Sequence, residues 1–84
     1  MKNRTEIYAA DLYVLLSREF QRRKPNDCAA CYVQLPYRVD RIDPTAPNWE
    51  VLIPPDCPHG CRVVMEDLVQ QYGTVYDLAS ERRN

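Results

Sequence analysis

Four cysteines in two close pairs constrain this chain more than any other feature. Two residues separate Cys28 from Cys31, three separate Cys57 from Cys61, and 25 lie between the pairs in a chain of 84. Residues 1–84 are long enough for a single domain, and a domain this small buries only about 60 to 65% of its unfolded surface. Many such domains are therefore stabilised by a metal or by disulfides. Because each tight turn brings two sulfur atoms together, the spacing predicts one zinc ion held by all four cysteines.

Other chemistries use the same part of the chain. His59, the only histidine, lies between Cys57 and Cys61 and is an alternative ligand in place of one cysteine. An iron–sulfur cluster also takes four thiolates, so iron is retained as an alternative to zinc. The pair Cys28 and Cys31 has the spacing of a thiol redox site, but it precedes a predicted strand and does not open a helix. A redox role is therefore the weaker interpretation.

Hydrophobic periodicity predicts a helix at the start of the chain. Apolar residues at positions 8, 12, 15, 16 and 20 share one face of a helix over residues 4–22. Asn3 and Glu6 have the spacing of a capping box, and Pro25 stops the helix. Residues 1–24 therefore form the N-terminal helical segment.

The middle of the chain alternates between apolar and polar residues, which predicts two strands. Residues 32–42 place Val33, Leu35, Tyr37 and Val39 on one face, and residues 49–53 place three more apolar side chains on one face. Pro36 marks the first strand as an edge strand or as one with a break. A turn-rich stretch joins the two, so we expect a β-hairpin.

A second helix is expected after the second cysteine pair. Val64, Leu68 and Tyr72 lie on one stripe of residues 62–72, Gly73 suits the C-cap, and Gly60 is expected to have a positive φ. Residues 73–84 are expected to be a tail or a short final helix over residues 75–82. The expected fold is thus α+β: a small zinc-stapled domain with an N-terminal helix, a hairpin and one or two C-terminal helices.

The order of these elements resembles a known group of zinc proteins. A cysteine knuckle, a hairpin and a cysteine pair at a helix start resemble treble-clef and zinc-ribbon structural zinc sites over residues 28–72. The resemblance is one of architecture. The first pair lacks the proline and glycine common in such knuckles, and the second pair has three spacer residues in place of two. The resemblance implies a structural zinc ion and raises the expectation of nucleic-acid binding.

Charge and composition limit the possible functions. The net charge of −1 argues against a surface that is basic throughout, although residues 1–24 carry six basic against three acidic residues. No apolar run approaches the 18 residues of a membrane span, and no export signal is apparent, so we expect a cytoplasmic protein without membrane contact. We expect no enzyme, because no serine, histidine and acid arrangement is visible and two glycines cannot form a phosphate loop.

The expected function is that of a small zinc-binding module acting as a protein-interaction, adaptor or regulatory domain. Tyr13 and Tyr76 lie off the helical stripes and are expected to be exposed, and the first helix offers a face for self-association. Thiol redox activity is one alternative. The other is nucleic-acid binding, or contact with an acidic partner, through the basic helix end formed by Arg18, Arg22, Arg23 and Lys24, with Arg38, Arg41, Arg82 and Arg83 in support.

Overall fold

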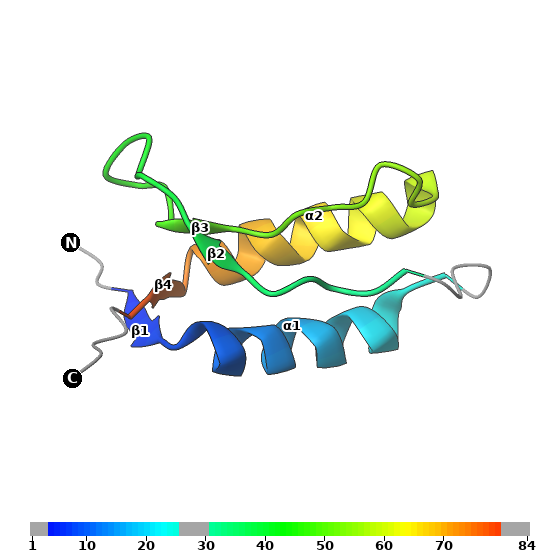
Figure 1. Ribbon diagram of the computed structural model, residues 1–84, viewed down its shortest axis with the longest axis horizontal. Coiled ribbons are helices and arrows are strands. Elements are labelled where there is room, and N and C mark those ends of the chain that lie inside the picture. The colour runs from blue at the N-terminus through cyan, green and yellow to red at the C-terminus, as the bar shows by residue number, and fades with distance from the viewer. Residues whose placement is uncertain (1–3, 26–30, 80–84) are drawn as a thin grey trace.

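Two antiparallel helices form the long sides of the molecule (Figure 1). The computed structural model describes residues 4–25 and 31–79. Helix α1 spans Ala9–Arg23 and helix α2 spans His59–Gly73. The side chain of Arg23 ties the two helices together, because it donates to Asp67 Oδ2 at 2.9 Å and to Gln71 Oε1 at 3.0 Å.

The apolar face predicted for the first helix is confirmed, whereas its start is not. Leu12, Leu16 and Phe20 are 0 to 1% exposed and form the inward face of α1. The helix begins at Ala9, five residues later than expected, and Tyr8 precedes it without a side-chain cap. Glu6 lies in a strand, so the predicted capping box is wrong; Asn3 lies outside the described residues.

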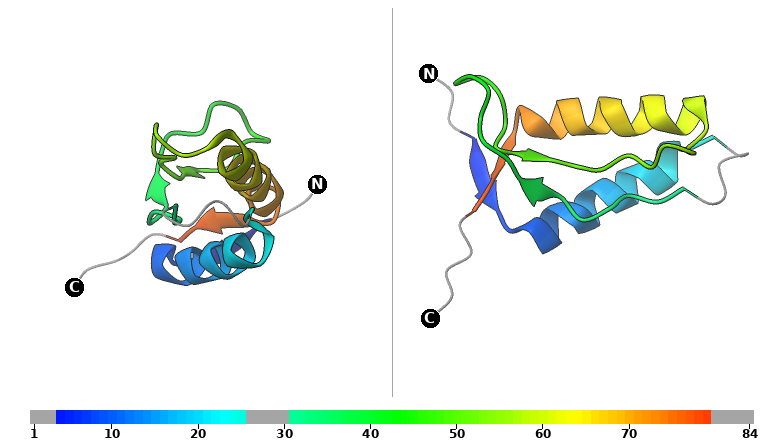
Figure 2. Two further views of the ribbon diagram at one scale, coloured as in Figure 1. Left: turned by 90° about the vertical axis from the view of Figure 1, so that its right-hand side faces the viewer. Right: turned by 45° about the horizontal axis from the view of Figure 1, so that its top comes forward.

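A parallel pair of strands closes one end of the helix pair (Figure 2). Strand β1 spans Thr5–Ile7 and strand β4 spans Tyr76–Leu78, with Glu6 opposite Asp77. The expected final helix is therefore wrong over its described part; residues 80–82 lie outside the described residues. The reason is tertiary, because β1 and its flanks offer backbone partners: Thr5 N donates to Val75 O, and Ala79 N donates to Ile7 O.

The second edge of β4 is held by side chains of the hairpin. The amide of Asn48 pairs with the backbone of Leu78, accepting from its N–H at 2.7 Å and donating to its carbonyl at 3.2 Å. Trp49 is fully buried, and its indole N–H donates to Tyr76 O at 3.0 Å. These bonds satisfy backbone groups that would otherwise be an open strand edge.

The predicted hairpin is present, but its strands are short. Strand β2 spans Tyr37–Arg38 and pairs antiparallel with strand β3, Trp49–Glu50. The apolar face expected for the first strand is wrong in its middle, because Leu35 is 57% exposed and Tyr37 is 45% exposed. Pro36 offers no N–H to a ladder, which explains why regular pairing begins only after it. The expected α+β fold class is confirmed.

The inward face of α2 is rotated from the predicted stripe. Cys61, Met65 and Leu68 are buried, at intervals of four and three residues, whereas Val64 and Tyr72 are only half-buried. Among the described residues, no helix has the length and the apolar character needed to cross a membrane.

Gly73 is required for close packing and not for a left-handed turn. It is the last residue of α2 and Thr74 is the C-cap, so the expected C-cap position of Gly73 is wrong by one residue. No described glycine has a positive φ, so the positive φ expected for Gly60 is also wrong. A Cβ atom on Gly73 would lie 3.0 Å from Cγ of Pro47. The helix therefore meets the hairpin loop at van der Waals distance only because the side chain is absent.

We expect Gly73→Ala to destabilise the protein by about 1 kcal/mol, although alanine favours helix by about the same amount, because the crowded Pro47 ring must move. Urea denaturation followed by circular dichroism measures the difference. In a Pro47→Ala background the same substitution should become neutral or stabilising. A stabilising Gly73→Ala in the wild-type background would contradict this account.

Candidate metal centre

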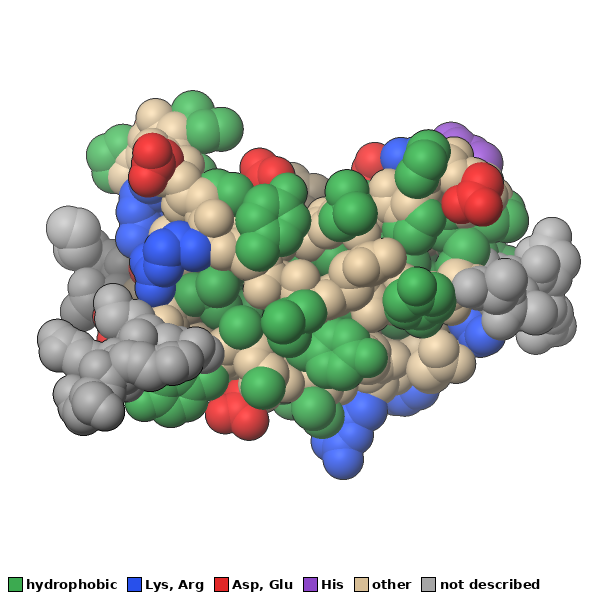
Figure 3. Space-filling model, in the orientation of Figure 1, with side chains coloured by type: hydrophobic (Ala, Val, Ile, Leu, Met, Phe, Trp, Pro, Cys, Tyr) green, Lys and Arg blue, Asp and Glu red, His purple; other side chains and the backbone are tan. Residues whose placement is uncertain are grey.

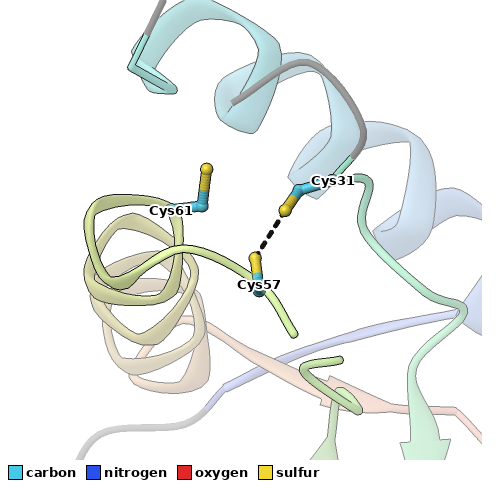
Figure 4. Close-up of side chains that lie close together, drawn as sticks. All are labelled: Cys31, Cys57 and Cys61. Carbon is cyan, nitrogen blue, oxygen red and sulfur yellow. Dashed lines mark hydrogen bonds between the residues drawn. The ribbon is translucent and has the colours of Figure 1, made fainter. Parts of the chain in front are cut away.

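Three of the four cysteines meet at one end of the molecule (Figure 4). Cys31 lies before the hairpin, Cys57 lies in the loop before α2, and Cys61 lies in the first turn of α2. Their sulfur atoms all lie within 4.8 Å of one another, so these residues could hold a metal ion. Cys28 lies outside the described residues.

Local chain geometry explains how the second pair reaches this position. The backbone N–H of Cys57 donates to Pro54 O at 3.1 Å, which turns the chain after the second strand. Pro58, with φ of −58°, then precedes the helix, so Cys61 falls on its inward face. A Cβ on Gly60 would lie 3.1 Å from Cγ of Pro25, so glycine permits the close approach of the two chain segments here.

The sulfur geometry fits a tetrahedral thiolate site after a small adjustment. Cys31 Sγ and Cys57 Sγ are 2.7 Å apart, and both thiols are free. Zinc–sulfur bonds of about 2.3 Å in a tetrahedron place neighbouring sulfur atoms about 3.7 Å apart. The two side chains must therefore separate by about 1 Å around an ion, a movement that rotation about their Cα–Cβ bonds provides. Cysteine sulfur is the donor that zinc and other soft metals prefer.

Burial and the neighbouring cysteine raise the pKa of the Cys57 thiol to about 11. Burial is the largest cause, the hydrogen bond and the charge of Cys31 add to it, and the guanidinium of Arg62 opposes it. The thiol is thus protonated at neutral pH when no cation is bound, and a metal must displace its proton. A redox nucleophile usually has a lowered thiol pKa, so this environment is unfavourable for that role.

Arg62 is a residue of the site that the sequence pattern did not reveal. Its guanidinium lies 3.5 Å from the carbonyl oxygens of Pro54 and Pro55, beside the turn that carries Cys57. It therefore places a positive charge beside a cluster that becomes anionic when it binds a metal. Its position directly after Cys61 is the one sequence feature that could have identified it as a residue of the site.

His59 is not among the donors that the structure brings together. It is exposed at the start of α2, and the group of sulfur atoms within 4.8 Å contains no histidine. Its role as an alternative ligand stays a prediction.

Two of the basic side chains at the helix end already form ion pairs. Arg18, Arg22 and Arg23 are all exposed, but Arg22 lies 3.4 Å from Glu19 Oε1. Arg23 pairs with Asp67 and also lies 3.9 Å from Glu19. Lys24 is half-buried as the C-cap of α1. Nucleic-acid binding through these residues stays a prediction; it requires binding of DNA or RNA at low salt that weakens steeply as salt is added.

No protein-family model, curated protein or solved structure matches the chain, so its likeness to treble-clef and zinc-ribbon sites stays one of architecture.

Proposed function

We propose that this chain is a small zinc-binding module of the cytoplasm, in which a structural ion stabilises the fold and a protein surface performs the function. The observation that carries this proposal is the convergence of Cys31, Cys57 and Cys61, whose sulfur atoms lie within 4.8 Å of one another. The first of these residues lies 26 positions from the second. Folding thus brings sulfur atoms from distant parts of the chain close enough for one metal ion to bind them. We propose Cys28 as the fourth ligand.

A structural role for the ion follows from the size of the core. Ten of the residues that the structure describes form the buried cluster, and two of these are Cys57 and Cys61. A metal there would link the start of α2 to the segment that precedes the hairpin. Metal binding would then contribute folding free energy directly.

Native mass spectrometry of the purified chain tests this proposal. We expect one zinc ion per chain, and we expect a strong chelator to remove both the ion and the helical circular dichroism signal. After denaturation with a chelator, all four cysteines should react with iodoacetamide. A chain without metal, whose circular dichroism is unchanged by the chelator and falls only on adding a thiol reductant, would show that a disulfide takes the place of the ion. Detection of an iron-loaded chain would support the metal site and would show that its ion is iron and not zinc.

A thiol redox role is the second candidate, because Cys31 Sγ and Cys57 Sγ are only 2.7 Å apart. Oxidation would join the two sulfur atoms and release two protons, while two electrons pass to a disulfide oxidant such as oxidised glutathione, which becomes two thiols. A metal-loaded chain that resists excess oxidised glutathione would exclude this role.

A further inference from the structure

A groove lies between the hairpin and α2, away from the cysteine cluster. Its volume is about 660 Å³, within the range of sites that enclose a small ligand. In Figure 1 the loop that borders it stands out at the upper left, whereas the start of α2 lies at the right. We call this cavity the hairpin groove; it is lined by some of the side chains between residues 39 and 53, by Arg4, and by residues from the second half of α2 to Thr74.

The groove combines apolar side chains with unpaired negative charge. Val51, Ile53 and Val69 line it and are half-buried. Three carboxylates also line it, and none forms an ion pair with a described lysine or arginine: Asp40, Glu50 and Glu66.

Arg4, the one basic side chain among the described residues that line the groove, is already engaged. Its guanidinium donates to the carbonyl oxygens of Gly73 and Thr45 and lies 4.0 Å from Asp77 Oδ1. Asp77, which does not line the groove, also pairs with Arg41, so it does not balance the charge of Arg4 alone. The described side chains that line the groove still carry three carboxylates against one guanidinium, which leaves the groove with a net negative charge.

The loop that walls the groove is held in place by its own contacts. Thr45 donates through its N–H and its hydroxyl to Asp43 Oδ1, and these bonds hold the pKa of that carboxyl below its usual value. Arg41 donates to Ala46 O and pairs with Asp77. These contacts fix a wall from which Ile42 projects with 86% of its surface exposed. Figure 3 shows this corner as a projection at the upper left of the surface.

We propose that the hairpin groove binds a short peptide segment of a partner protein that carries lysine or arginine beside apolar residues. The segment would place its cations against the three carboxylates and its apolar side chains against Val51, Val69 and Ile42. This inference deepens the proposed interaction role and rests on it. The net negative charge of the groove disfavours phosphate, so we do not expect this surface to bind nucleic acid.

The test is a titration of the ¹⁵N-labelled, metal-loaded full chain with a blocked hexapeptide of alternating lysine and valine. We expect backbone amide shifts at Val51, Val69 and Gly73, and none with the matching peptide of glutamate and valine. Glu66→Lys should weaken binding about tenfold through loss of one attraction and gain of one repulsion. Asp11→Lys changes charge equally on the exposed surface of α1 and is the matched control; Glu66→Gln replaces Glu66→Lys if that variant does not fold.

No shift at these residues with millimolar lysine peptide, or equal weakening by Glu66→Lys and Asp11→Lys, would overturn the groove as a binding site. The metal content is measured on the same sample. A loaded chain without shifts therefore refutes the groove alone, and a folded chain without metal refutes the zinc proposal alone.

Discussion

Cys61→Ser should abolish the folded state, with loss of the helical circular dichroism signal at 25 °C. The apparent free energy of binding of a structural zinc ion is about 10 to 16 kcal/mol at neutral pH. A chain of this length has a total stability of about 4 to 13 kcal/mol, from the usual 0.05 to 0.15 kcal/mol per residue. Loss of one ligand from the site should therefore exceed the available margin. Thermal melts of the purified variant measure the result.

The substitution also removes a buried side chain, so the metal contribution needs its own control. Chelator should reduce the wild-type protein to the state of Cys61→Ser and should not change the variant further. His59→Ala is the matched neighbour, because His59 is exposed two residues away in the same helical turn. It should retain its ion and its melting temperature. Loss of metal on His59→Ala would instead identify that side chain as a ligand.

Trp49→Ala should destabilise the protein by about 3 to 5 kcal/mol, the second largest effect that we expect. Trp49 is the largest fully buried side chain, and its indole links the hairpin to β4 through Tyr76 O. Trp49→Phe retains most of the ring but leaves that carbonyl without its donor, so about 1 to 3 kcal/mol should be lost.

Urea denaturation followed by circular dichroism measures both variants, since the chain has a single tryptophan and its replacement removes the fluorescence signal. Leu52→Ala is the matched control, because Leu52 follows on the same segment but is 56% exposed. It should change the free energy of unfolding by no more than about 0.5 kcal/mol. Comparable losses for Trp49→Ala and Leu52→Ala would contradict the assigned core.

Local signals predicted the elements of this fold that depend on local chemistry. The face of α1 with Leu12, Leu16 and Phe20 follows from a spacing of four residues, and the cysteine pairs mark the place where the chain converges. The hairpin follows from alternation and a turn-rich connection. Each of these inferences uses residues that are close in sequence, where periodicity is informative.

The sequence by itself determined the helices, the hairpin and the candidate metal ligands, because amphipathic spacing and paired thiols are properties of neighbouring residues. Only the tertiary structure decided that residues 76–78 form a strand, because their partners lie about 70 positions away in β1. It also decided that α2 turns Cys61 inward beside Cys31, which comes from a distant part of the chain and which the local stripe could not indicate. The hairpin groove also could not be predicted from the sequence, because its apolar lining and its three carboxylates come from segments that only folding brings together.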